Sequence, residues 1–341
     1  MGMEKVTLAS IEAQVAEWLQ SQSGRGNEQL IGEMLRTVIK LGQEDTSRGD
    51  LKILNRTLKE LRQAFKIFAP YSSIRKVSIF GSTRVEEGTP YYLSAKDLGH
   101  RLVEKGFMVI TGAGPGVMQA GHEGAGREQS FGVNIRLPAV QKANRIIRGD
   151  PKLINFHFFF TRKLMFVKEA DAVVIFPGGF GTHDELTEAL TLAQTGKSQL
   201  VPIVLVDLPG GNYWKMWLEF VREAVLHRGY ISERDLSLFK IVDEVDEVVN
   251  EIQTFYHNYH SYRFVKQDLV IRLNHRPTQA LIDRLNRDFG DIVSGEVRET
   301  KPLPDESDDP RTLDLPRLVF NFNREDFARL RQMIDVINGS E

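Results

Sequence analysis

Two glycine-rich turns in the sequence contain residues that could bind an anion. The first is T-G-A-G-P-G-V-M at 111–118. Its glycines, Gly112, Gly114 and Gly116, would let backbone N–H groups approach a ligand without a Cβ in the way. The dinucleotide fingerprint G-x-G-x-x-G is not met, because Val117 stands where its third glycine belongs. A tight strand-to-helix turn without a ligand would use the same glycines, so this turn alone leaves both interpretations open.

The second turn, P-G-G-F-G-T-H-D-E at 177–185, gives the stronger prediction. Pro177 would end the preceding apolar run as a strand, because proline cannot donate to a strand ladder. The loop glycines are Gly178, Gly179 and Gly181. Thr182 and Glu185 have the spacing of a capping box, which would only stabilise the start of a helix. In the alternative, the Thr182 hydroxyl and the loop N–H groups hold a phosphate at that helix end. Two such turns after separate strands of one sheet favour the phosphate-binding interpretation.

A cationic pair, Arg162 and Lys163, follows the apolar run F-H-F-F-F at 156–160. Cations in such surroundings lose hydration unless an anion meets them, and arginine can grip a phosphate or carboxylate with two hydrogen bonds. The alternative is two surface charges beside a buried aromatic face. His257 and His260 have H-x-x-H spacing but lack the H-E-x-x-H pattern, so we predict no metal site there.

These segments lie where short β-rich runs alternate with helical patterns of ten or more residues, which predicts βαβ units. The expected strands are 77–80, 107–111, 131–135, 172–176, 200–206 and 241–242. The expected helices are 94–105, one opening at 117, 158–169, 182–195, 213–227 and 244–256. This order predicts an α/β fold, a Rossmann-like doubly wound parallel sheet, over 71–258.

Two segments flank this core. Residues 1–70 predict a helical extension, because apolar residues recur every three or four positions, with a break at 22–27. Residues 264–341 predict a small α+β domain. Its expected strands are 269–273, 296–300 and 318–322, its helices 278–289 and 324–337, and its exposed loop 302–310. We expect this domain to fold separately, to modulate the core and to contribute no catalytic residue.

The composition excludes several classes of protein. Among 341 residues there is no cysteine, which removes disulfides, thiolate nucleophiles and cysteine metal sites. The net charge of −2 gives no overall basic footprint for nucleic acid. No apolar run approaches the ~20 residues that span a bilayer, and the first residues lack a signal-peptide pattern. We therefore expect a cytoplasmic protein without a nucleic-acid or membrane partner.

The motifs taken together resemble those of the LOG family, whose members are sometimes mislabelled lysine decarboxylases. The matching segments are V-S-I-F-G-S at 77–82, T-G-A-G-P-G-V-M-Q-A at 111–120, T-R-K-L-M at 161–165 and P-G-G-F-G-T-H-D-E-L-T-E at 177–188. The resemblance covers about 70–256. It implies a phosphoribohydrolase that cleaves nucleoside 5′-monophosphates to free base and ribose 5-phosphate, needs no cofactor and forms at least a homodimer. A pyridoxal phosphate decarboxylase would need a Schiff-base lysine, and no local context singles one out.

The resemblance also implies site residues. The catalytic pair falls on Arg162 and Glu185. The substrate-binding residues fall on Gly81, Ser82, Gly112, Gly114, Gly116, Met118, Lys163, Pro177, Gly178, Gly179, Gly181 and Thr182. We expect Arg162 to keep Glu185 ionised, because a nearby cation lowers the pKa of a carboxylate. Ala113 and His183 depart from the family pattern, at positions where a glycine and an apolar residue are common. The alternative to an enzyme is a non-catalytic nucleotide sensor whose C-terminal domain transmits the signal.

Overall fold

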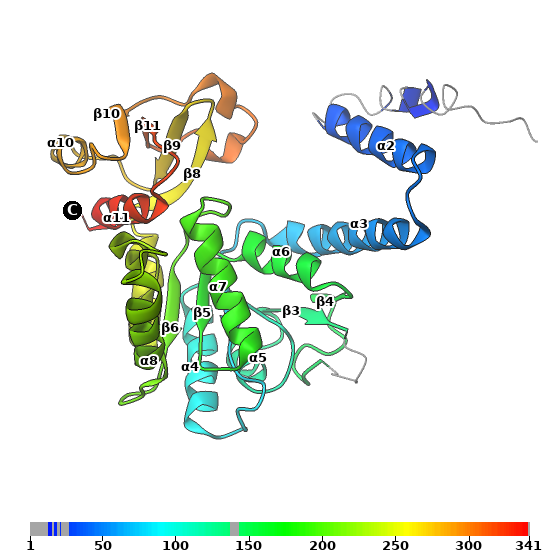
Figure 1. Ribbon diagram of the computed structural model, residues 1–341, viewed down its shortest axis with the longest axis horizontal. Helices are drawn as coiled ribbons and strands as arrows, with labels where there is room; N and C mark the ends of the chain where they lie inside the picture. Colours follow the sequence, from blue (N-terminus) through cyan, green and yellow to red (C-terminus); the bar gives the residue numbers. More distant parts are fainter. Residues whose placement is uncertain (1–12, 16, 19–20, 22–26, 137–142, 340–341) are drawn as a thin grey trace, which may run out of the picture. The chain divides into compact units, whose positions relative to one another are not determined.

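The computed structural model describes residues 13–15, 17–18, 21, 27–136 and 143–339. By internal contacts the chain forms two units, 1–62 and 63–341. In the first unit, α2 spans Glu28–Gln43 and α3 begins at Arg48, ending at Phe68 in the second unit (Figure 1). These helices confirm the helical prediction for this part of the chain. The break predicted at 22–27 lies outside the described residues apart from Asn27, as does the segment 1–12.

A seven-stranded parallel sheet forms the centre of the second unit. Its strands are β1 Lys76–Phe80, β2 Met108–Thr111, β3 Ser130–Ile135, β4 Leu153–Phe156, β5 Ala172–Ile175, β6 Ile203–Val206 and β7 Lys240–Val242. The order is β4-β3-β2-β1-β5-β6-β7, and every neighbouring pair is parallel. This confirms the predicted doubly wound fold. The prediction missed β4, a four-residue strand with every second residue buried.

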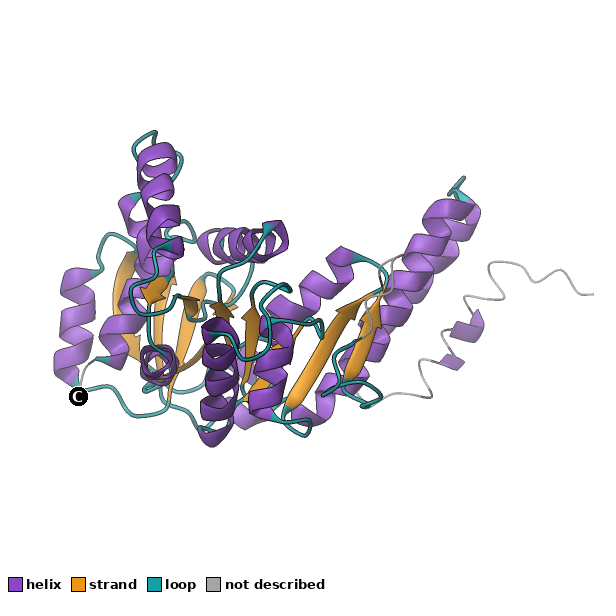
Figure 2. Cartoon of the chain, turned by 90° about the horizontal axis from the view of Figure 1, so that it is seen from below, coloured by secondary structure: helices purple, strands orange, loops and turns teal. Residues whose placement is uncertain are grey.

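Helices cover both faces of this sheet, as Figure 2 shows. They are α4 Pro90–Glu104, α5 Val117–Ala125, α6 Phe159–Glu169, α7 Phe180–Gln194, α8 Tyr213–Phe220 and α9 Val245–Phe255. One core cluster joins α4, α5 and α9 to the sheet through buried residues such as Leu98, Val117 and Val248. On α6, Phe166 packs against Phe80 of β1, with ring centroids 4.7 Å apart. A strand buried by helices on both faces reads as a continuous apolar run, which is why these strands were visible in the sequence.

A second, antiparallel sheet follows in the order β10-β11-β9-β8. Its elements are β8 Tyr259–Val265, β9 Asp268–Leu273, α10 Gln279–Asp288, β10 Val293–Glu299, β11 Arg317–Phe322 and α11 Phe327–Asn338. The predicted α+β order is present, with β8 added in a stretch expected to link two domains. The prediction of an exposed loop at 302–310 is wrong in part, because Glu306 is fully buried between Arg272 and Arg317.

The last helix, α11, packs against the parallel-sheet part of the same unit. Arg331 of α11 pairs with Glu251 of α9 at 2.6 Å, and both side chains are buried. The Asn338 side chain accepts hydrogen bonds from the backbone N–H groups of Asn258 and Tyr259. Whether 264–341 folds alone stays a prediction. Among the described residues, no helix has the length and apolar character needed to cross a membrane.

Candidate active site

The three turns after β1, β2 and β5 meet at the carboxyl edge of the parallel sheet. After β1 the next strand, β2, lies toward one edge of the sheet, and after β5 the next strand, β6, lies toward the other edge. Ligands of doubly wound proteins bind at such a switch in strand order. The Ser82 N–H donates to the Pro177 carbonyl at 3.0 Å, and the Val117 N–H donates to the Ser82 carbonyl at 3.1 Å. The turns therefore form one connected rim around a cavity of about 790 Å³.

Most of the predicted site residues line this cavity. They are Gly81, Ser82, Gly112, Met118, Arg162, Gly178, Gly179, Gly181, Thr182 and Glu185. Four others lie just behind it. Gly114 and Pro177 offer their carbonyls to Asn144 and Ser82. Gly116 has a φ of +69°, and a Cβ there would lie 2.3 Å from the Ser82 carbonyl oxygen. Lys163 pairs with Asp184 and Glu188.

Thr182 does not cap its helix. The helix α7 begins at Phe180 with Gly179 as its N-cap, so Thr182 lies inside the first turn. The predicted capping box is therefore wrong, because the helix starts two residues earlier than the sequence suggested. A Cβ on Gly178 would lie 2.0 Å from the Thr182 hydroxyl, so only glycine fits beside it. This places a free helix end and a hydroxyl at the cavity, an arrangement that suits a phosphate.

Arg162 and Glu185 form a largely buried ion pair on the cavity wall. The Arg162 Nη2 lies 3.2 Å from Glu185 Oε1, and the two side chains are 14% and 8% exposed. Lys163 Nζ lies 3.9 Å from the other carboxylate oxygen. Burial raises the pKa of Glu185, against the opposing effect of Lys163 and Arg162. Arg162 therefore lowers this pKa, as expected, but the loss of hydration outweighs the attraction of both cations and the net shift is upward.

Arg162 also keeps unused hydrogen-bonding capacity. Its Nε is buried and has no hydrogen-bond partner among the described residues. An unsatisfied buried donor of this kind costs about 1–3 kcal/mol. The guanidinium lies 4.9 Å from the centre of the Phe159 ring.

Aromatic residues that the sequence analysis did not select line the same cavity. Phe159 and Phe180 are 49% and 96% exposed. His183 Nε2 lies 2.7 Å from the Tyr213 hydroxyl, which donates to the Gly178 carbonyl at 2.5 Å. Phe180 could have been selected from its place inside the glycine motif. Tyr213 could not, because it comes from another helix with no local motif.

A buried polar network supports the turn at 112–116. His122 Nε2 lies 3.0 Å from both the Thr111 hydroxyl and the Phe131 carbonyl. The Asn144 amide donates to the Gly114 carbonyl, and the Thr111 hydroxyl accepts from the Ala113 N–H. Burial lowers the pKa of His122 to about 4, so its ring is neutral at physiological pH. Ala113 itself has a φ of +59°, which this network maintains.

The described residues contain no group of three or more histidine or carboxylate side chains with metal-binding geometry. The cavity thus offers glycine backbone, a helix N-terminus, one ion pair and aromatic rings. These groups can bind a phosphate and a planar ring, and can present one carboxylate to a reacting atom between them.

Comparison with known proteins gives a family match and several related enzymes. A family model described as "Possible lysine decarboxylase" matches residues 115–252. A probable cytokinin riboside 5′-monophosphate phosphoribohydrolase of Oryza sativa subsp. japonica is 31% identical over 47% of this chain, which spans 64% of that relative. A cytokinin riboside 5′-monophosphate phosphoribohydrolase of Arabidopsis thaliana is 30% identical over 47% of this chain and 74% of its own length. A pyrimidine/purine nucleotide 5′-monophosphate nucleosidase of Escherichia coli (strain K12) is 28% identical over 48% of this chain and 37% of its own length.

Proposed function

The chain belongs to the LOG family, and on this premise we propose that it hydrolyses the N-glycosidic bond of nucleoside 5′-monophosphates. The products would be the free base and ribose 5-phosphate. The observation that carries the proposal is the buried Arg162–Glu185 pair on the wall of a cavity bounded by glycine turns. The family model matches residues 115–252, which contain both residues, and the listed relatives are named for this class of activity.

The substrate phosphate would lie at the start of α7. The N–H groups of the loop around Gly178–Gly181 and the hydroxyl of Thr182 offer donors there, and the helix dipole favours negative charge. The exposed rings of Phe159 and Phe180 would offer faces to the base. The ribose would then lie between phosphate and base, beside Glu185.

Cleavage breaks the bond between the ribose C1′ and the base nitrogen, and a water oxygen bonds to C1′. The bond pair leaves with the base, which takes up a proton, and the water loses one. Positive charge develops on the ribose before the water attacks, and a fixed carboxylate stabilises that charge or accepts the water proton. Glu185 would do this in its ionised form, while Arg162 holds the carboxylate in place.

The experiment is to incubate the purified protein with AMP, GMP, CMP and UMP and to quantify free base and ribose 5-phosphate. Glu185→Gln should still bind the nucleotide but turn over about 10²–10⁴-fold more slowly, the scale of a positioned acid–base group. AMP should be a far better substrate than adenosine, because the loop binds phosphate. Cleavage by Glu185→Gln at the wild-type rate would limit Glu185 to a structural role, and equal kcat/KM for AMP and adenosine would exclude phosphate recognition.

The alternative is a nucleotide sensor without catalysis. The packing of α11 against the end of α7 favours it, since a signal could pass along that helix from the same cavity. Tight nucleotide binding by the wild-type protein with no product from any of the four nucleotides would identify the sensor.

A further inference from the structure

A second cavity lies at the opposite edge of the parallel sheet, where β1, β5 and β6 begin. Its volume is about 870 Å³, within the range of small-molecule binding sites. The walls come from 72–75, 170–171 and 196–201 on the parallel-sheet side, and from β8 and 309–312 on the other side. The cavity therefore lies between the two sheets and belongs to neither alone.

The charge of this cavity favours an anion. Five cationic and two acidic side chains line it: Arg75, Lys168, Lys197, Arg272 and Arg311, with Asp171 and Asp309. Lys197 is exposed, and within 27–136 and 143–339 no carboxylate lies within 4 Å of its ammonium. Arg311 is 73% exposed. Among the described residues its carboxylate partner is Asp309, with Arg311 Nε 3.3 Å from Asp309 Oδ1. Arg75, Lys168 and Arg272 each pair with a carboxylate, so Lys197 and Arg311 are the cations most available to a ligand.

Aromatic side chains form another part of the lining. Tyr259 and Tyr262 are buried, whereas Tyr256 and Phe264 are half-buried and offer ring surface to the cavity. The Arg75 guanidinium already stacks on Tyr256, 3.5 Å from the ring centre. Planar rings bind well between aromatic and guanidinium faces. The ligand that fits this lining carries both a planar ring and several negative charges.

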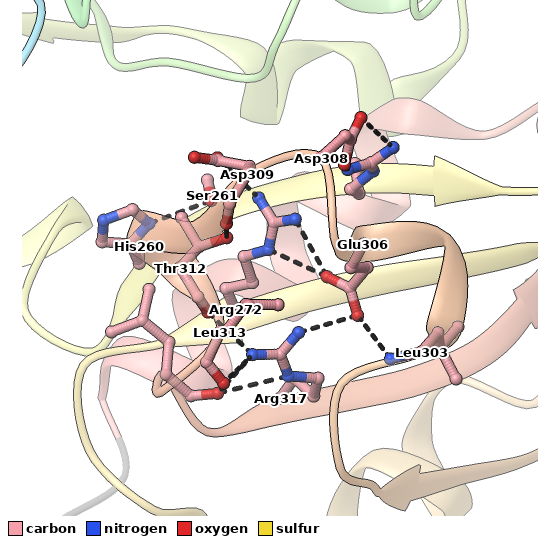
Figure 3. Close-up of polar contacts among 12 residues, drawn as sticks. His260, Ser261, Arg272, Leu303, Glu306, Asp308, Asp309, Thr312, Leu313 and Arg317 are labelled. Atoms are coloured by element: carbon pink, nitrogen blue, oxygen red, sulfur yellow. Dashed lines mark hydrogen bonds and ion pairs between the residues drawn. The ribbon is translucent and has the colours of Figure 1, made fainter. Parts of the chain in front are cut away.

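The wall made by 304–313 is rigid, because a buried ion-pair cluster holds it to the sheet (Figure 3). Glu306 accepts from Arg272 at 2.9 Å and from Arg317 at 2.7 Å, and Arg317 also donates to the carbonyls of Thr312 and Leu313. Arg272 thereby presents its guanidinium at the cavity, where Asp309 lies 3.9 Å away. Burial and the neighbouring Arg75 and Arg272 lower the pKa of His260, so that ring is neutral and can accept or donate a hydrogen bond.

One helix of the candidate catalytic pair, α6, lines this second cavity, and the loop that follows the other, α7, lines it too. On α6, Arg162 faces the first cavity, while Leu164 and Val167 line the second. From Glu185 to the end of α7 at Gln194 is nine residues, about 14 Å at 1.5 Å per residue, and Gly196 follows in the loop that lines the second cavity. Gly196 has a φ of +64°, and a Cβ there would lie 1.9 Å from the Phe327 ring of α11. A ligand in the second cavity would touch α6 and the loop that follows α7.

We propose that this second cavity binds a nucleoside triphosphate as an effector, with the base beside Tyr256 and Phe264 and the phosphates on Lys197 and Arg311. Binding shifts the far ends of α6 and α7 and so changes the placement of the catalytic pair. Couplings of this kind change affinity or turnover by about 5- to 150-fold. The binding site stands independently of the proposed hydrolysis, which adds only the turnover readout.

The test is calorimetric titration of the full chain with ATP, GTP, CTP and UTP. At least one should bind, and Lys197→Glu and Arg311→Glu should each weaken it tenfold or more. Lys105→Glu, an equal charge reversal of an exposed lysine outside both cavities, should leave the affinity unchanged. Adenosine and inorganic triphosphate should each bind more weakly than the intact triphosphate, since each lacks half of the contacts.

A competition experiment separates the two cavities. Saturating AMP on Glu185→Gln should not displace the triphosphate. Displacement by AMP, an unchanged affinity in Lys197→Glu, or no binding of any of the four triphosphates at millimolar concentration would each overturn the proposal. All of these are binding measurements, so a protein that fails to cleave AMP still gives a decisive answer.

Discussion

At the scale of single residues, the surroundings of Glu185 set the pH at which the proposed reaction can run. Burial raises the pKa of this carboxyl above its usual value of 4.5, and the reaction needs its ionised form. We therefore expect kcat/KM for AMP to fall on the acid side with an apparent pKa above 4.5. Lys163→Met removes a cation 3.9 Å from the carboxylate, so it should move this acid limb to higher pH.

The measurement is kcat/KM from about pH 4 to pH 9 for the wild type and Lys163→Met, on the scale set by ordinary carboxyl pKa values. Lys215→Met serves as the control, because Lys215 is exposed on α8 and lines neither cavity. An acid limb at or below 4.5, or a limb that Lys163→Met moves to lower pH, would contradict this account of Glu185.

Single residues also show what the sequence could predict of the site. The glycine turns and the pair Arg162–Glu185 were identified from motifs and lie around one cavity. The prediction that Thr182 caps its helix was wrong, because the exact first residue of a helix depends on backbone geometry and sequence patterns place it only to within one or two residues. The part played by Tyr213 could not be predicted from a motif, because its contact with Gly178 joins positions that are 35 residues apart.

At the scale of elements, the turn at 112–116 depends on a buried neutral histidine. The pKa of His122 is about 4 in the folded protein, below the 6.5 of an unperturbed histidine. As the pH falls from 6.5 toward 4, the unfolded chain takes up a proton that the folded chain does not, so stability present above 6.5 is lost. At pH 5 the loss should be about 2 kcal/mol.

Urea unfolding at pH 7 and pH 5 measures this loss. His122→Gln cannot take up the proton, so its free energy of unfolding should change less between the two pH values, by about 2 kcal/mol. His100→Gln, at an exposed position on α4, should keep the wild-type pH dependence. If His122→Gln retains that dependence as well, another group is responsible for it.

The parallel strands were predictable because strands buried on both faces are continuous apolar runs in the sequence. The strand β8 and the burial of Glu306 were not predictable. The strand β8 has buried residues only at Tyr259, Tyr262 and Val265, which resembles neither a helix nor an alternating strand. Glu306 lies in an acidic run that reads as solvated, and its burial depends on two arginines from distant strands. Long-range charge pairing leaves no local pattern in the sequence.

At the scale of the whole molecule, the parts beyond the family resemblance suggest assembly and regulation. Apolar side chains at Phe159, Phe160, Leu164 and Phe180 are exposed near the candidate active site. An apolar patch of this kind is typical of an interface, and the homodimer implied by the family resemblance stays a prediction. Among the described residues, 264–339 contribute none to the first cavity but form part of one wall of the second.

This division predicts the effect of removing the C-terminal domain. A chain ending at Tyr256 keeps every residue that lines the first cavity, so it should retain some cleavage of AMP if it stays folded. It should be much less stable, because Glu251 loses Arg331, its partner at 2.6 Å, and the apolar surface under α11 becomes exposed. Arg331→Met in the full chain isolates the first loss, which should cost about 1.5–3 kcal/mol in urea unfolding, since the buried Glu251 loses a charged hydrogen bond but keeps Lys240 as a partner. Arg311→Met, on the surface of the same segment, should cost well under 1 kcal/mol.

For the shortened chain, circular dichroism would establish folding, and titration with AMP would establish binding. A folded, AMP-binding chain that cleaves nothing, and that regains cleavage when residues 257–341 are added in trans, would place an essential part of the catalytic machinery in the C-terminal domain.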